Sequence, residues 1–201
     1  MNAMNIKQEE QPLLPTQQYW FDIDSPEMIE MERFNSDALI KVNFEINLDI
    51  LNRVIRTLVQ KHDILRATFH KTEDRGWIQL CAKEANNPPI RVFDLSDCNP
   101  ADYISQVETH CKHIQNSEPF NLQTGPLVKS FWFYGPGKKD NYFWIYTHHL
   151  LLDGISVLLI PEEIFRLYKQ IAAGEEPTFP QVKDSSQKFV SDFLDHYFKK
   201  D

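Results

Sequence analysis

The 201-residue sequence has few of the features that mark metal, disulfide-stabilised or membrane proteins. It contains three cysteines, Cys81, Cys98 and Cys111, at long spacings and without a CxxC pair, so neither a zinc site nor a disulfide framework is predicted. No apolar run approaches the ~20 residues of a membrane span, and the polar N-terminus lacks the apolar region of a signal peptide. We therefore expect a cytoplasmic protein with buried, reduced cysteines, no bound metal and no membrane partner.

Positive charge is also scarce, since 21 Lys and Arg stand against 29 Asp and Glu, for a net charge of −8. A nucleic-acid surface needs clustered Lys and Arg that neutralise phosphates, and two short Lys pairs do not supply it. The GxSxG, GxxxxGK and GxGxxG patterns of serine hydrolases, phosphate-binding loops and dinucleotide-binding folds are absent too. The sequence thus argues against nucleic-acid partners and bound nucleotide cofactors.

What the sequence does contain is a mixture of strand and helix patterns typical of an α/β fold. Its hydrophobic content of 42% allows a real core. We predict a loose polar lead over 1–11 and one folded unit over 12–201. Strands are expected at 38–46, 65–70, 77–81, 90–95, 127–134 and 142–147. Helices are expected at 17–21 after a capping Thr16, at 48–61 after a capping Asn47, from the Asn99-Pro100 pair to 116, at 154–173, and from Ser185 or Ser186 to 199.

The segment 147–156, THHLLLDGIS, lies where a predicted strand gives way to a helix. If both histidines belong to the strand, His148 and His149 point to opposite faces, which makes a shared metal site unfavourable. Asp153 follows three leucines that favour burial, and a buried carboxylate needs a cation or donors. Gly154 permits a backbone geometry or a close approach that a Cβ would block. Spacing alone leaves a structural role open, with a hydrogen-bonded core histidine and an Asp-Gly turn.

Four motifs, in the same order along the chain, resemble those of a known family. Residues 148–154 (HHLLLDG) match the HHxxxDG signature of the condensation domains of nonribosomal peptide synthetases, and residues 61–69 (KHDILRATF) resemble that family's RHExLRTxF. Residues 14–21 (LPTQQYWF) resemble its opening motif, and 119–122 (PFNL) with 125–127 (GPL) resemble its PFDL…GPLxR stretch. The resemblance covers nearly the whole chain and implies a chloramphenicol acetyltransferase-like lobe, a mixed β-sheet flanked by helices.

The resemblance also implies a chemistry. In that family, donor acyl or peptidyl groups and acceptor amines arrive on the phosphopantetheine arms of carrier proteins, with no other cofactor bound. His149 would accept the acceptor's proton or hold the amine, and His148 would support it. Asp153 would form a salt bridge with Arg66 of the upstream motif, and Gly154 would leave room for an arm or supply a backbone donor.

Length departs from this pattern, because complete condensation domains are much longer and carry a second lobe that closes the tunnel. We therefore expect the N-terminal lobe alone, with the C-terminal lobe absent and amide-forming activity weak or lost unless a partner lobe is supplied. The alternatives are the lobe of an epimerization domain, a free trimeric acyltransferase, and a non-catalytic module that docks on a carrier. The sequence leaves the donor and acceptor open, and also the role of His149 as base or positioning group.

Overall fold

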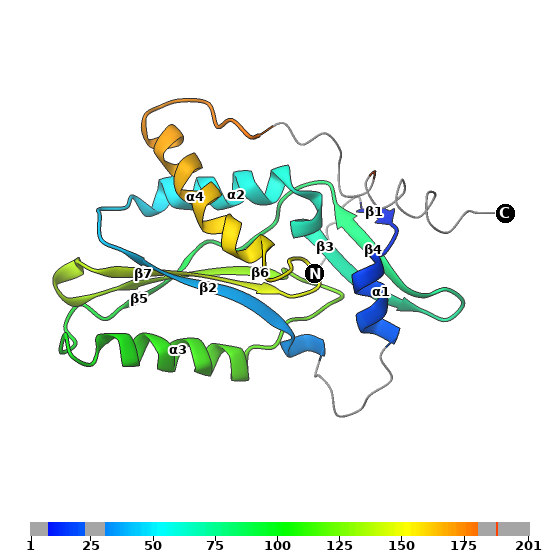
Figure 1. The fold of residues 1–201 in the computed structure, drawn as a ribbon, viewed down its shortest axis with the longest axis horizontal. Coiled ribbons are helices and arrows are strands. Elements are labelled where there is room, and N and C mark those ends of the chain that lie inside the picture. The colour runs from blue at the N-terminus through cyan, green and yellow to red at the C-terminus, as the bar shows by residue number, and fades with distance from the viewer. Residues whose placement is uncertain (1–7, 23–30, 181–187, 189–201) are drawn as a thin grey trace, which may run out of the picture.

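The computed structural model describes residues 8–22, 31–180 and 188 of the chain. They form two β-sheets with helices packed around them (Figure 1). A three-stranded sheet has the order β1-β4-β3, and a four-stranded sheet has the order β2-β7-β6-β5. The strands are β1 (Gln8–Gln11), β2 (Asn35–Val42), β3 (Ala67–Thr72), β4 (Gly76–Ala82), β5 (Arg91–Asp94), β6 (Val128–Tyr134) and β7 (Asn141–His148). The helices are α1 (Pro15–Asp22), α2 (Leu48–Lys61), α3 (Tyr103–Ser117) and α4 (Ser156–Ala172).

The four-stranded sheet forms the centre of the fold. Its strand β7 pairs antiparallel with β2 on one side and β6 on the other, and β6 pairs parallel with β5. Helices α2 and α4 cover one face and α3 covers the other (Figure 1). Aromatic and β-branched residues, which pleated surfaces favour, fill β6 and β7 and are buried on both faces. The predicted strands at 127–134 and 142–147 are thereby confirmed.

Several other predicted elements also form. Helix α2 has the predicted limits, and the Asn47 side chain accepts hydrogen bonds from the backbone N–H groups of Asp49 and Ile50. Strands β3 and β4 form the predicted hairpin, in which Gly76 has a φ of +69°. Strand β5 lies within the predicted range 90–95. The mixed sheets and their flanking helices confirm the α/β class.

The first two strands differ from the prediction. Strand β2 runs from Asn35 to Val42, whereas a strand at 38–46 was predicted. It therefore starts three residues earlier and ends four residues earlier than predicted. Pairing with β7 decides these limits, and Phe44 is left 47% exposed. The loose lead predicted over 1–11 is wrong for its last four residues, because Gln8–Gln11 pair with β4 as β1. Residues 1–7 and the predicted last helix after Ser185 or Ser186 lie outside the described part, apart from residue 188.

Two helix starts also differ. Helix α1 begins at Pro15, one residue before Thr16, and the Gln17 side chain accepts a hydrogen bond from the Leu14 N–H in place of the predicted cap. Helix α3 begins at Tyr103, because the Asn99 side chain caps a separate turn by accepting from the Ala101 N–H. In both cases a local polar group is satisfied, but the helix follows at a different residue.

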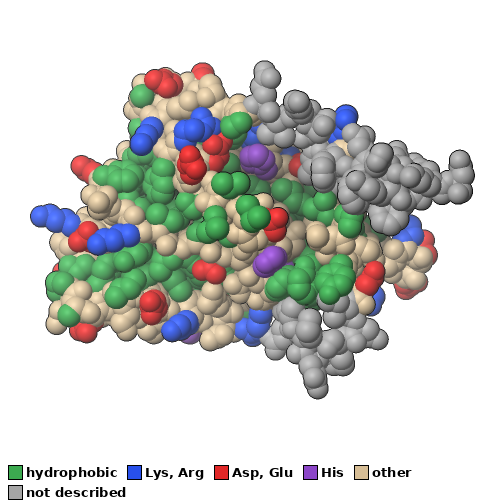
Figure 2. All heavy atoms as spheres, in the orientation of Figure 1, with side chains coloured by type: hydrophobic (Ala, Val, Ile, Leu, Met, Phe, Trp, Pro, Cys, Tyr) green, Lys and Arg blue, Asp and Glu red, His purple; other side chains and the backbone are tan. Residues whose placement is uncertain are grey.

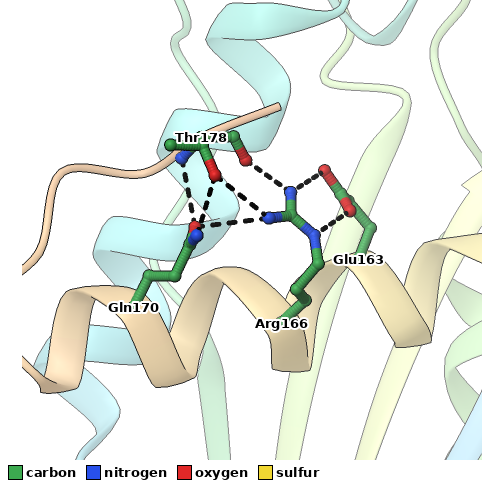
Figure 3. Close-up of polar contacts among 4 residues, drawn as sticks. All are labelled: Glu163, Arg166, Gln170 and Thr178. Carbon is green, nitrogen blue, oxygen red and sulfur yellow. Dashed lines mark hydrogen bonds and ion pairs between the residues drawn. The ribbon is translucent and has the colours of Figure 1, made fainter. Parts of the chain in front are cut away.

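The chain after α4 folds back onto that helix. Arg166 forms an ion pair with Glu163 and also donates hydrogen bonds to the backbone and side-chain oxygens of Thr178, and Gln170 bonds Thr178 as well (Figure 3). Next along the chain, Phe179 packs against the end of α2. These contacts hold the segment up to Phe179 against α2 and α4.

Candidate functional site

The residues of the predicted site lie at the junction between β7 and α4. Strand β7 ends at His148, a turn follows, and α4 begins at Ser156. In the antiparallel pairing with β2, His148 lies opposite Asn35, which is the last paired position of both strands. The turn that carries His149 therefore leaves the sheet at a fixed edge, close to the segment that enters β2.

His148 is fully buried and uses both ring nitrogens. Its Nε2 lies 2.5 Å from the Met31 carbonyl oxygen, and its Nδ1 accepts a hydrogen bond from the Leu150 N–H at 3.1 Å. Because a carbonyl only accepts, the proton is assigned to Nε2 and the ring is the neutral tautomer. Burial lowers the pKa of His148 to about 4. His148 is therefore a packed, neutral support whose nitrogens are both engaged.

His149 has a different environment, as the predicted divergence of the two histidines requires. Its side chain is partly exposed, and its backbone N–H donates to the Phe34 carbonyl oxygen at 2.9 Å. The imidazole stacks on the Phe34 ring with centroids 4.4 Å apart and planes 8° apart. Within the described residues its ring nitrogens make no hydrogen bond. The ring is therefore held by stacking while its nitrogens stay available.

Asp153 is exposed and does not lie among the leucines that precede it. Its Oδ1 accepts from the Ser156 N–H at 2.7 Å, and its carbonyl oxygen accepts from the Val157 N–H at 3.1 Å. Hydrogen bonds from the backbone and side chain of Ser156 lower the pKa of the Asp153 carboxyl. The prediction of a buried carboxylate is wrong, because the chain turns outward after the buried Leu151 and Asp153 caps the start of α4.

Arg66 does not pair with Asp153, so the predicted salt bridge is wrong. The Arg66 Nε donates to the Ala82 carbonyl oxygen at 2.7 Å, and Nη1 donates to those of Val59 and Gln60, each at 2.6 Å. The last carbonyls of a helix have no partner within the helix, and a nearby guanidinium satisfies them well. Arg66 therefore joins the end of α2 to β4, and Asp153 needs no cation because water reaches it.

Within the described chain, Gly154 has neither the special backbone geometry nor the close approach that was predicted for it. Its φ lies outside the left-handed region, and a Cβ added there would have no atom within 4 Å. The fold itself would thus accept a side chain at this position. The side of Gly154 on which a Cβ would stand is open space.

Two residues that sequence reasoning missed hold the histidine turn. Phe34 stacks on His149, as described above. Gln17 is 2% exposed, and its Nε2 donates to the Leu150 carbonyl oxygen at 2.8 Å while its Oε1 accepts from the Leu14 N–H at 2.8 Å. Gln17 belongs to the motif at residues 14–21, so the sequence could have indicated it. No sequence pattern indicates Phe34, because its contact with His149 depends on the pairing of two distant segments.

The surroundings of the site are apolar and open. Three hydrophobic side chains at the start of α4 are strongly exposed, Ile155 by 74%, Leu158 by 72% and Leu159 by 60%. Where α4 begins, Figure 2 shows hydrophobic side chains at the surface, next to an acidic and a histidine side chain. Two hollows lie away from the histidine turn: one of about 550 Å³ is lined by α1, β1 and β4, and one of about 100 Å³ has Arg66 in its lining. Within the part of the chain that the structure describes, the turn from Asp153 to Ile155 lies exposed at the surface.

The described part of the chain holds no group of three or more His, Cys, Asp and Glu arranged to bind a metal ion. In the same residues, no helix has both the length and the apolarity needed to cross a bilayer. Both Cys81 and Cys111 are buried, and burial raises the pKa of each thiol to about 12. These thiols therefore stay protonated and unreactive at neutral pH.

Comparison with known proteins gives a consistent match. A family model described as "Condensation domain" matches residues 7–197. A linear gramicidin synthase of Brevibacillus parabrevis is 29% identical over 188 residues, which are 94% of this chain and 4% of that protein. A plipastatin synthase of Bacillus subtilis is 28% identical over 181 residues, 89% of this chain and 7% of that protein. The chain thus spans a small part of these relatives.

Solved structures match the fold. The epimerization domain from the third module of tyrocidine synthetase B has a TM-score of 0.77 at 20% identity, with 97% of this chain and 42% of that chain covered. The first condensation domain of the calcium-dependent antibiotic synthetase, solved with a substrate analogue, has a TM-score of 0.77 at 17% identity, with 94% of this chain and 44% of that chain covered. The chain therefore corresponds to less than half of either structure.

Proposed function

Because this chain belongs to the condensation-domain family, we propose that it is the histidine-bearing N-terminal half of a nonribosomal peptide synthetase condensation domain. The complete domain would join a donor acyl or peptidyl group to an acceptor amine, with both substrates carried on the phosphopantetheine arms of carrier proteins. The family membership agrees with the resemblance that the four motifs carry. The arms enter as parts of the carriers, and no resident cofactor is proposed.

The single observation that carries the proposal is the state of His149. Its imidazole is partly exposed and stacks on the Phe34 ring, and its nitrogens make no hydrogen bond within the described residues. A neutral imidazole takes up a proton readily near neutral pH, and such general-base help is typically worth about 10²–10⁴-fold. The neighbouring His148 has no such freedom, because both of its nitrogens are bonded and its pKa is about 4.

The proposed step is an acyl transfer. The acceptor nitrogen attacks the carbonyl carbon of the donor thioester, so that a C–N bond forms and the C–S bond breaks. His149 takes the proton that the amine loses, and that proton then passes to the departing thiolate, which leaves as the free thiol of the donor arm. Holding the two tethered substrates together would supply much of the remaining acceleration.

The neighbours of His149 have supporting parts in this proposal. Asp153 caps α4 and so holds the end of the turn, and Gly154 leaves the adjoining space free for an arm. Arg66 acts at a distance, through the packing of α2 on β4. The exposed Ile155, Leu158 and Leu159 form an apolar surface, and clustered exposed apolar side chains often mark an interaction site. We assign its cover to a second lobe.

An epimerization lobe is the second candidate, since a tyrocidine synthetase epimerization domain has the same fold as this chain. Such a domain would use His149 to move a proton at the α-carbon of one carrier-bound residue and would form no amide. The two candidates differ in their substrates. Exchange of the α-proton for deuterium with a single loaded carrier indicates epimerization, and amide formation with two loaded carriers indicates condensation.

The proposal is tested in the complete domain that contains this chain. We expect His149→Ala to lower amide formation by about 10²-fold or more, as measured by mass spectrometry of the carrier-bound product. The matched control is His113→Ala, an exposed histidine on α3, which lies on the opposite face of the sheet from α4. Unchanged product formation by His149→Ala would reject the role of this imidazole.

A further inference from the structure

Phe34 contacts His149 through both its backbone and its ring, and we propose that it is a positioning residue that fixes the plane of the imidazole. Its catalytic consequence rests on the function proposed above, but the positioning itself does not. Phe34 lies between the short helix Met31–Arg33 and β2, far from His149 in the sequence. The fold brings the two residues face to face.

The backbone pairing explains why these two residues meet. In the antiparallel register of β2 and β7, Asn35 lies opposite His148, so the next positions outward are Phe34 and His149. The His149 N–H donates to the Phe34 carbonyl oxygen at 2.9 Å, which extends the pairing by one hydrogen bond beyond the strands. Directly opposed side chains in such a pair are close neighbours, and here the rings stack at 4.4 Å and 8°.

The Phe34 ring is itself supported. Trp20 of α1 packs against it with centroids 4.6 Å apart, and the His148 ring meets it edge-on at 6.2 Å. The backbone of Phe34 is fixed as well, because its N–H donates to the Met31 carbonyl oxygen, the same oxygen that His148 Nε2 contacts. The half-buried Phe34 ring therefore contacts Trp20 and His148 as well as His149, and turning away would break these contacts.

A stacked face restricts what the imidazole can do. The lone pair that accepts a proton lies in the ring plane, and rotation of the ring out of that plane would break the stack on Phe34. With one face covered, a substrate can reach His149 through the ring edge, where the nitrogens are. Misplacement of a reacting group by about 1 Å can cost about 10²-fold in rate, so a fixed plane has a measurable effect.

The positioning is tested first on the unmodified 201-residue chain by NMR. We expect nuclear Overhauser effects between the His149 and Phe34 ring protons, and upfield-shifted His149 ring resonances, because these protons lie over an aromatic face. His149→Gln assigns these resonances by their loss. Phe34→Leu should move them downfield, Phe34→Tyr should leave them in place, and Phe44→Leu is the control, because it removes an exposed phenylalanine that makes no ring contact with either histidine. Absence of the Overhauser effects, or unmoved resonances in a folded Phe34→Leu chain, would overturn the proposal.

The catalytic consequence is tested in the complete domain. We expect Phe34→Leu to lower kcat by about 10- to 100-fold with little change in KM, and Phe34→Tyr to restore most of it. If kcat stays unchanged in Phe34→Leu while His149→Ala abolishes the reaction, the positioning role is overturned and the proposed function stands. If His149→Ala itself has no effect, the proposed function fails, and the spectroscopic result still decides whether Phe34 orients the ring.

Discussion

At the scale of single residues, two adjacent histidines have opposite environments because successive side chains of an extended segment point to opposite faces. His148 is the last residue of β7 and points into the core, where two hydrogen bonds fix its tautomer. His149 is the first residue past the strand and faces outward against Phe34. The first histidine is thus part of the core, whereas the ring nitrogens of the second make no hydrogen bond within the described residues.

The buried His148 makes stability depend on pH. Its pKa is about 4 in the folded chain, because burial disfavours the charged ring, against about 6.5 when unfolded. As the pH falls, the unfolded state therefore binds the proton first. The contribution of neutral His148 to the free energy of unfolding is complete above pH 6.5 and is lost between pH 6.5 and pH 4, by roughly 3 kcal/mol in all.

Urea unfolding at pH 7 and pH 5 measures this contribution. From pH 7 to pH 5, the free energy of unfolding of the unmodified chain should fall by about 2 kcal/mol more than that of the His148→Gln variant. Other histidines titrate in both proteins, so their contributions cancel in the difference. Equal losses in the two proteins would contradict a neutral, buried His148.

The separation of Arg66 from Asp153 gives a second prediction. Asp153→Ala should lower the free energy of unfolding by about 1 kcal/mol, the usual cost of a lost helix cap. Arg66→Met should cost about 1–3 kcal/mol, because three backbone carbonyls lose their donor. The double variant should show the sum of the two costs within about 0.5 kcal/mol. If urea unfolding shows that the cost of the double variant differs from this sum by well over about 0.5 kcal/mol, the two side chains do pair.

Residue types at the site were readable from the sequence, but their contacts were not. The motif gave the positions of His148, His149, Asp153 and Gly154, and alternation along a strand gave the divergence of the two histidines. The pairing expected between Arg66 and Asp153 failed because solvent exposure and helix-end carbonyls satisfy each group separately. Phe34 could not be found, since only the register of β2 on β7 brings it to His149.

At the scale of elements, the accuracy of the predictions follows how local the deciding forces are. Helix α2 was predicted with its limits, because an apolar stripe and a capping Asn47 act within the segment itself. Strand β1 was missed, because its polar residues are ordered only by pairing with β4. Strand β2 was displaced for a similar reason, since its limits depend on β7. Pairing between distant segments is the part that a single sequence does not show.

Helix α1 is joined to the histidine turn through Gln17, and this link yields a third prediction. Gln17→Leu removes the donor to the Leu150 carbonyl oxygen and the acceptor of the Leu14 N–H in a buried place. We expect a loss of about 1–3 kcal/mol in urea unfolding, because buried polar groups are left without partners. The control is Gln18→Leu on the same helix, which is exposed and should change stability by less than about 0.5 kcal/mol. Equal effects of the two variants would show that the link does not hold the turn.

At the scale of the whole molecule, the histidine site is open and its apolar border is exposed. Leu158 and Leu159 stand at the surface of α4, while Ile160 and Ile164 of the same helix are buried. The chain covers less than half of the solved structures that share its fold. Both facts support the proposal that a second lobe completes the site and that this half alone does not hold two carrier-bound substrates together.

Amide formation by the 201-residue chain, with donor-loaded and acceptor-loaded carriers, tests that account most directly. We predict that the chain alone gives little or no amide, that adding the second lobe produces it, and that His149→Ala removes it again. Full turnover by the chain alone, or turnover in the two-lobe assembly that His149→Ala leaves unchanged, would contradict the account.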